Sequence, residues 1–377
     1  MRNKMIVIMF LAYIVVFSVG SLIAKDRVFS DMENRNLEQF PKVDSEAILD
    51  GSFTEQFESY MSDQIIFKDH LVRIKVAENR VLNQTFINGV YFAEDGMLIQ
   101  DYVKPYNQLS KNIQYVNEFV EANPDLSYTW LVIPNACYIY QDRLPAYATC
   151  YDQQEVMGYV LGNASGSMQI VDCSQELLDA KDEYIFYNTD HHWTMNGAYI
   201  GYTALCNAMG LNATPKDDYD IIVGSSDFLG TQYSNAPAFG QKPDEVLIFN
   251  NPEGEYKVEY IDDNVTTDSL YNYDNLNIKD KYTVYLDGNH SYLRITSNCV
   301  NCNAEGKAED KLLVIKDSYA HCLLPLLADN YSEIYVVDLR YYHQSVSELA
   351  RDNGITQVLF INNLEFLSTD DNFLWLQ

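Results

Sequence analysis

Four short apolar runs, each leading to a polar residue, constrain the fold of this chain most strongly. Continuous apolar runs bounded by turn residues are typical of strands buried on both faces of a parallel sheet. Helix-like segments separate the last three runs, and this alternation favours an open α/β sheet with right-handed crossovers. The runs are Tyr128–Ile133, Leu312–Ile315, Ile334–Val337 and Gln357–Ile361.

The carboxyl ends of these runs carry polar and reactive side chains. Ligands of open α/β sheets bind beyond the carboxyl ends of the strands. The sequence therefore predicts a site at this edge of the sheet, with Asn135, Ser318, Arg340 and Asn363 as the residues that reach it.

The rest of the chain gives weaker structural signals. Helical spacing predicts a helical arm over 45–83 and a helix over 107–122, and short strands on either side of Glu94–Gly96 predict a hairpin. Between 228 and 310 the pattern changes to alternating residues and predicts β hairpins inserted into the α/β domain. The alternating stretches are Val246–Phe249, Tyr256–Tyr260 and Tyr282–Leu286.

The N-terminal segment from Met5 to Ala24 contains no charged residue. Twenty helical residues span about 30 Å, the hydrocarbon thickness of a bilayer, so this segment predicts a transmembrane helix. Arg2 and Lys4 precede it, and by the positive-inside rule they place the N-terminus in the cytoplasm and the rest of the chain outside. The alternative is a cleaved signal peptide, with Ser18–Gly20 as the cleavage site.

Composition narrows the class of partner. The chain has 25 Lys and Arg against 54 Asp and Glu, a formal charge of −29. Such a surface repels phosphate backbones and anionic headgroups, which excludes nucleic acid as the expected partner and leaves neutral, hydroxyl-rich molecules.

Seven cysteines are too few and too scattered for a disulfide scaffold. The only close pair is Cys299 and Cys302. Zinc would require a second pair at matching spacing, so this pair predicts a local disulfide or two loop thiols.

Two motifs carry the candidate chemistry. Thr194 is expected to cap a helix that runs to Met209 and ends at Gly210, which places the motif Asp190–Trp193 in the loop before it. Asp-x-His supplies an oriented imidazole, and Ser318 directly after a strand supplies a hydroxyl that this imidazole can activate. Together they suggest acyl transfer or ester hydrolysis.

Plainer interpretations stay open at this point. Asp190 and His192 could be capping and core groups, and Ser318 could be only a helix N-cap. Metal ligation is a further alternative, but adjacent His191 and His192 point different ways on an extended loop, so no metal is predicted. Further ligands would have to come from His70, His290, His321 or His343.

The motifs together resemble the DHHW proteins, relatives of the SGNH-like alginate O-acetylation proteins. The resemblance covers most of the chain after the apolar segment. It rests on Val132–Pro134, Asp190–Trp193, Val314–Tyr319 and Tyr335–Arg340, with Glu33–Arg35, Asp63–Gln64, Asp95–Gly96 and Gly288–His290 in addition.

The resemblance implies a circularly permuted SGNH-hydrolase-like fold, a parallel sheet flanked by helices, in which the Asp-x-His element precedes the nucleophile strand. It implies Ser318 as nucleophile, His192 as general base and Asp190 as the group that orients this base. Lys316 stands where SGNH proteins have glycine, which is a departure from the pattern.

The resemblance also implies an oxyanion hole made of the nucleophile's amide, a glycine and an asparagine from the next two strand ends. Those ends carry Arg340 and Asn363 here, and Asn362 is an equally polar neighbour. Arg340, Asn363 and Asn289 are therefore the expected oxyanion or substrate contacts.

The expected function is that of an extracytoplasmic O-acetyltransferase or esterase, without a cofactor, acting on a cell-surface polysaccharide or cell-wall glycan beside a membrane-bound O-acyltransferase. The competing expectation is an inactive protein that binds the glycan or the acyltransferase. The expected divisions are an anchor with a short cytoplasmic tail at 1–27, a helical arm and hairpin at 28–110, the SGNH-like domain at 111–227 and 311–377, and the β-rich insertion at 228–310.

Overall fold

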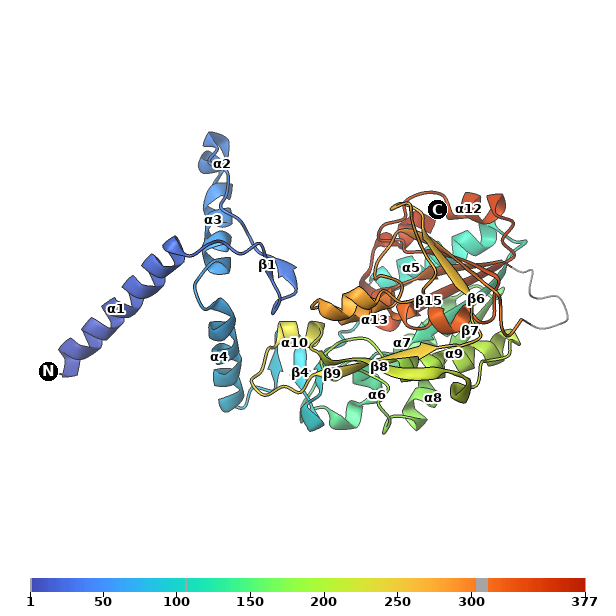
Figure 1. The fold of residues 1–377 in the computed structure, drawn as a ribbon, viewed down its shortest axis with the longest axis horizontal. Helices are drawn as coiled ribbons and strands as arrows, with labels where there is room; N and C mark the ends of the chain where they lie inside the picture. The colour runs from blue at the N-terminus through green and yellow to red at the C-terminus, as the bar shows by residue number, and fades with distance from the viewer. Residues whose placement is uncertain (1, 106, 303–310, 377) are drawn as a thin grey trace. The chain divides into compact units, whose positions relative to one another are not determined.

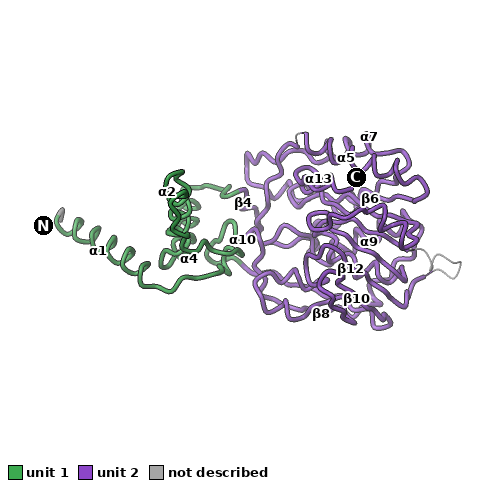
Figure 2. Tube along the Cα trace, turned by 90° about the horizontal axis from the view of Figure 1, so that it is seen from above, with its two compact units in different colours: residues 1–88, 233–241 green, residues 89–232, 242–377 purple. Residues whose placement is uncertain are grey.

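The computed structural model describes residues 2–105, 107–302 and 311–376 (Figure 1). Met1 and the end of the predicted insertion, 303–310, lie outside these ranges. The chain divides into two compact units (Figure 2). Unit 1 comprises residues 1–88 and 233–241, and unit 2 comprises residues 89–232 and 242–377.

Unit 2 is built on an eight-stranded sheet in the order β11-β10-β12-β14-β13-β15-β6-β7. The four predicted apolar runs are confirmed as the adjacent parallel strands β14, β13, β15 and β6. β7 extends the parallel part, while β12, β10 and β11 add antiparallel strands at the other edge. The bounds are β6 Ser127–Ile133, β7 Met168–Asp172, β10 Tyr256–Tyr260, β11 Val265–Thr267, β12 Tyr292–Ser297, β13 Leu312–Lys316, β14 Glu333–Val337 and β15 Gln357–Asn363.

Helices in the connections cover this sheet. α5 buries an apolar stripe that includes Leu109, Ile113 and Val116, as its helical spacing predicts. α9 has the predicted limits, because the Thr194 side chain accepts from Gly197 N and Gly210 ends the helix at a φ of 67°. The helices are α5 Asn107–Ala122, α6 Ala136–Ile139, α7 Gln153–Asn163, α8 Ser174–Asp179, α9 Met195–Met209, α11 Leu324–Leu327, α12 Val346–Asp352 and α13 Leu364–Thr369. The helix α10 Thr231–Asn235 includes the boundary at residue 233 between the segments of the two units.

The hairpin β4 Val90–Phe92 and β5 Leu98–Gln100 forms around the 3₁₀ turn η1 Glu94–Gly96, as predicted. The predicted insertion contributes β9 Asp244–Asn250 and β10 to β12, and β9 pairs antiparallel with β8 Asp220–Phe228, which precedes the predicted insertion except for Phe228. Cys299 and Cys302 form a local disulfide, and the other five cysteines are free thiols.

The strand predicted at Tyr282–Leu286 is wrong, because residues Lys281–Val284 form the 3₁₀ helix η5. Tyr282 and Tyr285 are three residues apart, the period of a 3₁₀ helix, and both are buried. Their hydroxyls donate to the carbonyls of Ser318 and Leu247. Both tyrosine hydroxyls therefore have acceptors, although the segment does not form the expected strand.

Unit 1 contains the helices α1 Arg2–Ile23, α2 Ser45–Asp50, α3 Ser52–Asp63 and α4 Lys68–Val81, with the short strands β1 Phe29–Ser30, β2 Arg35–Asn36 and β3 Phe86–Ile87. The segment Lys4–Ile23 of α1 is long and apolar enough to cross a membrane by length and composition, a test that a signal sequence also passes.

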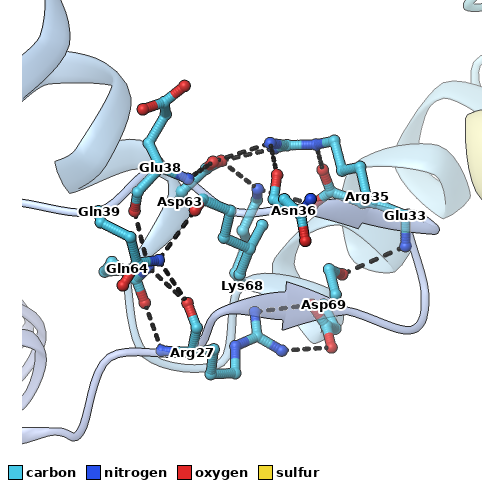
Figure 3. A network of polar contacts seen from close by, with 12 residues as sticks. Arg27, Glu33, Arg35, Asn36, Glu38, Gln39, Asp63, Gln64, Lys68 and Asp69 are labelled. Carbon is cyan, nitrogen blue, oxygen red and sulfur yellow. Dashed lines mark hydrogen bonds and ion pairs between the residues drawn. The ribbon is translucent and has the colours of Figure 1, made fainter.

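A polar clasp joins the chain after α1 to the start of α4 (Figure 3). Its centre is the buried Asp63, which accepts hydrogen bonds from Arg35 Nη1 at 2.8 Å, Lys68 Nζ at 2.7 Å and Glu38 N at 2.8 Å. The hydrogen bond from Arg35 holds the pKa of Asp63 well below its usual range. The clasp consists of Arg27, Glu33, Arg35, Asp63, Gln64, Lys68 and Asp69.

Replacing Asp63 should loosen unit 1. Asp63→Ala leaves the Glu38 amide without its acceptor and removes one of the two carboxylates that pair with Lys68 and Arg35, so we expect a loss of about 2 kcal/mol in the free energy of local opening. Amide hydrogen exchange in α3 and α4 measures this change. Lys75→Ala, which breaks the exposed pair Lys75–Glu78, is the control and should change it by less than about 0.5 kcal/mol. Equal protection in both variants would contradict the role of the clasp.

Candidate active site

His192 stands between a carboxylate and a hydroxyl. Its Nδ1 lies 2.6 Å from Asp190 Oδ1, and its Nε2 lies 2.8 Å from Ser318 Oγ. Asp190 is itself held by the amides of His192, at 3.1 Å, and Thr231, at 2.7 Å. A Cβ atom on Gly230 would lie 2.3 Å from Asp190 Oδ2, so only glycine fits beside this carboxylate. The structure thus brings together Ser318, His192 and Asp190.

Ser318 begins the 3₁₀ helix η7 Ser318–His321, one residue after the end of β13. The preceding residue, Asp317, is buried and caps this helix by accepting from Tyr319 N at 2.8 Å. Its other oxygen accepts from Asn363 N at 2.7 Å and Asn363 Nδ2 at 2.8 Å. Asp317 therefore ties the serine turn to the end of β15.

Aromatic side chains fix the imidazole and the serine turn. The ring of Tyr282 stacks on His192 with centroids 3.8 Å apart, and its hydroxyl donates to the Ser318 carbonyl at 2.9 Å. Trp193 Nε1 donates to the Tyr319 carbonyl at 2.9 Å. Sequence reasoning missed Tyr282, because its alternating neighbourhood predicts a strand and gives no signal of contact with either motif.

The pKa shifts favour an ionised Asp190 beside a neutral His191. Burial opposes ionisation of Asp190, but His191 and His192 outweigh it and hold the pKa of this carboxyl well below its usual range. Burial lowers the pKa of His191 to about 4, so this imidazole is neutral near pH 7. Burial also raises the pKa of Asp317 to about 6.

Asp190, His191 and His192 offer the donor atoms of a small metal site, all within 4.8 Å of one another. Both ring nitrogens of His192 already have partners, however, in Asp190 and Ser318. A metal bound to His192 would have to displace one of them, so the donor set fits an acid–base role better than ligation.

The predicted oxyanion and substrate residues have defined neighbours. Arg340 Nε and Nη2 donate to Asp338 at 2.8 and 2.6 Å, and Nη2 also donates to Asn289 Oδ1 at 3.0 Å. Asn363 lies beside Asp317 as described above. Asn362 is buried and accepts from Trp130 Nε1 at 3.1 Å, so its side chain is engaged in the core.

Lys316, which stands where the resemblance has glycine, is the last residue of β13 and has no positive φ. Its buried ammonium lies 2.7 Å from Asp338 Oδ2 and 2.8 Å from His321 Nε2. The lysine side chain thus links the nucleophile strand to the carboxylate that holds Arg340.

A small pocket lies beside His191, and the polar part of its lining includes Gln100, Asp101, Asn135 and Glu365. Gln100 Nε2 donates to the Glu365 carboxyl. Burial, and then the charge of Asp101, raise the pKa of Glu365 to about 7. Glu365 lies in no motif of the sequence. Only the position of the preceding strand end, that of β15, brings its side chain to this pocket.

Fold and site define a mixed α/β protein with a Ser–His–Asp arrangement at the carboxyl edge of its sheet. The chain belongs to the DHHW protein family, which matches residues 101–337. A DHHW family protein from Eubacterium siraeum DSM 15702 is 23% identical, with a TM-score of 0.66 over 77% of this chain and 95% of that chain. Bacillus cereus PatB1, solved with a sulfonyl adduct, is 19% identical, with a TM-score of 0.62 over 76% and 100%.

The O-acetyltransferase domain of Pseudomonas putida AlgJ is 16% identical, with a TM-score of 0.45 over 75% of this chain and 93% of that chain. None of the curated proteins compared with this chain matches it. The family membership and the likeness to the first two structures confirm the predicted SGNH-like α/β fold.

Glu365 should make stability depend on pH. An acid whose pKa is higher in the folded than in the unfolded chain destabilises the fold once it ionises. Relative to Glu365→Gln, which keeps the acceptor for Gln100, the wild type should be equally stable near pH 4 and lose up to about 3 kcal/mol as the pH rises through about 7. Denaturant unfolding of both proteins across this range measures the difference, and a pH-independent difference would contradict the assignment.

Proposed function

We propose that this protein is an extracytoplasmic, membrane-anchored SGNH-like O-acyl transferase or esterase that acts on a cell-surface glycan through Ser318, His192 and Asp190. The observation that carries the proposal is the continuous contact from Asp190 Oδ1 to His192 Nδ1, and from His192 Nε2 to Ser318 Oγ at 2.8 Å. Membership of the DHHW family and the acetyl-transfer role implied by the sequence resemblance support it.

In the proposed first step Ser318 Oγ attacks the acyl carbonyl carbon, and His192 Nε2 takes the hydroxyl proton. Asp190 stabilises the imidazolium that forms, and its depressed pKa keeps it ionised for this task. The tetrahedral intermediate then releases the alcohol, which receives the proton from His192, and the acyl group stays on Ser318.

In the second step a sugar hydroxyl or a water molecule gives its proton to His192 and attacks the acyl carbon. The bond from this carbon to Ser318 Oγ then breaks, and His192 returns the proton to Ser318 Oγ. Attack by the sugar is transfer, and attack by water is hydrolysis, so both outcomes share one acyl-enzyme. We favour transfer of acetyl to a sugar hydroxyl, with a membrane-bound O-acyltransferase as the donor partner.

The developing oxyanion needs donors near Ser318. The amide of Ser318 at the start of η7 is the first proposed donor. Arg340, Asn363 and Asn289 remain proposed oxyanion or substrate contacts, since Asp338 and Asp317 hold Arg340 and Asn363 at the same edge of the sheet. A formal charge of −29 favours a glycan without many negative charges.

Two observations support a nucleophilic role over the alternative of an inactive binding protein. A protein that only binds a glycan does not need an ordered hydrogen-bond chain from carboxylate to hydroxyl. The similar Bacillus cereus PatB1 has been solved with a sulfonyl adduct, and such an adduct forms on a nucleophile. We propose that Ser318 is the corresponding group here.

Ser318→Ala should abolish cleavage of a generic acetyl ester by the purified protein. Loss of a nucleophile costs several orders of magnitude in turnover and leaves only the assistance of the oxyanion donors. Release of acetate from a chromogenic acetyl ester measures this, with Ser110→Ala on the exposed face of α5 as a control that keeps full activity. Wild-type turnover in Ser318→Ala, or loss of activity on addition of a chelator, would contradict the assignment.

Asp190→Asn should fold normally and lose turnover by about four orders of magnitude, because the amide holds His192 in the wrong tautomer and does not stabilise imidazolium. His191→Ala should lose far less, since Nδ1 of the neutral His191 ring lies 3.7 Å from Asp190 Oδ1, beyond hydrogen-bond distance. Turnover and circular dichroism of the two variants test this pair. Equal losses would indicate shared metal ligation rather than an orienting carboxylate.

A further inference from the structure

The outer end of α1 is built into the arm of unit 1. The Ser21 hydroxyl accepts a hydrogen bond from Ile66 N at 3.1 Å, and Ser21 is buried. Next to it, a Cβ atom on Gly20 would lie 2.5 Å from the Ile66 side chain. Gly20 thus allows Ile66, in the turn between α3 and α4, to lie directly against the helix.

This contact fixes the depth of the turn. If Lys4–Ile23 spans the hydrocarbon core, Gly20 lies about 5 Å inside its outer boundary, at 1.5 Å per residue. A residue that contacts Gly20 from the side must then lie at about the same level. Ile66 is therefore placed at the outer edge of the bilayer.

The residues of the turn suit that level. Ile65, Ile66 and Phe67 are consecutive and apolar, and the Phe67 side chain is 63% exposed. Phe67 also has a φ of 59°, a conformation that is strained for an aromatic residue. In water this side chain gains no burial to offset the strain, whereas a bilayer interface provides it.

Polar groups hold the turn and border it. Gln64 binds the backbone of Arg27 through both ends of its amide, at 2.9 Å each, and the Arg27 guanidinium binds Asp69 (Figure 3). Lys25 and Arg27 follow α1 in the sequence, where cations reach from the hydrocarbon boundary to the headgroups. The turn therefore cannot retract from the end of α1 without breaking the clasp.

We propose that the turn Ile65–Phe67 is a second membrane contact, with Phe67 inserted into the outer leaflet of the bilayer beside α1. This proposal rests on the membrane anchor of the proposed function. The contact removes the free hinge that would otherwise follow a single transmembrane helix, so unit 1 is held at a defined depth. The occupant is lipid, because the depth is set by the contact of Ile66 with the spanning helix itself.

Depth-dependent quenching tests the proposal in the full-length protein, reconstituted into phosphatidylcholine nanodiscs with or without brominated acyl chains. Phe67→Trp is compared with Tyr147→Trp, a matched control in unit 2 at which an aromatic residue is also exposed and has positive φ. The emission of the three natural tryptophans is subtracted with the wild-type protein. We expect the indole at position 67 to emit at shorter wavelength and to lose most of its emission to bromine, and the indole at position 147 to do neither.

Two failures are distinguishable. If alkaline carbonate releases the wild-type protein from membranes, α1 is not a membrane anchor, and this proposal is wrong as well. Stable incorporation, with the indole at position 67 quenched by aqueous iodide as strongly as that at position 147, would leave the anchor intact and overturn the membrane contact of the turn. Phe67→Ser, which removes the inserted ring, should stay anchored but increase amide hydrogen exchange at residues 64–70 in nanodiscs.

Discussion

The buried carboxylate of Asp317 joins the ends of neighbouring parallel strands, and the geometry of the candidate site depends on it. One oxygen receives the amide of Tyr319 and so shapes the turn that begins with Ser318. The other receives both nitrogens of Asn363 at the end of β15. Asn363 in turn accepts from Asn135 Nδ2 at 3.1 Å, at the end of β6. Three strand ends are thereby locked in register around one serine.

A second layer of charge lies beneath this edge. Lys316 Nζ and Arg340 Nη2 both donate to Asp338 Oδ2, at 2.7 and 2.6 Å. Removing one member of such a buried set leaves an uncompensated charge, which is strongly destabilising. The departure from glycine at Lys316 is therefore accommodated by a carboxylate at the end of the adjacent strand β14, and it connects the nucleophile strand to Arg340.

The sequence predicts the central sheet well because four of its strands are continuous apolar runs, whose burial depends on little beyond their own residues. It also brings Asp190, His192 and Ser318 into one hypothesis, because each lies in a motif at the end of an element. Tyr282 and Glu365 could not be found in this way. Their roles depend on contacts with segments far away in the chain, such as the stacking of Tyr282 on His192, and no local pattern encodes them.

The error at Tyr282–Leu286 has the same origin. Alternating aromatic and polar residues predict a strand, but a 3₁₀ turn buries the same tyrosines when distant carbonyls accept their hydroxyls. The antiparallel strand β12, which extends the sheet beside β14, was likewise missed. It lies between β10 and β14, and its side chains alternate between half-buried and buried over Tyr292–Ile295.

The central claim is that His192 activates Ser318 as a nucleophile, and covalent labelling tests it most directly. The full-length protein is treated with phenylmethylsulfonyl fluoride and digested, and the modified residue is located by peptide mass spectrometry. The account predicts one adduct, on Ser318, that is lost in His192→Ala although the fold is retained. Absence of an adduct on Ser318, or equal labelling in His192→Ala, would contradict it.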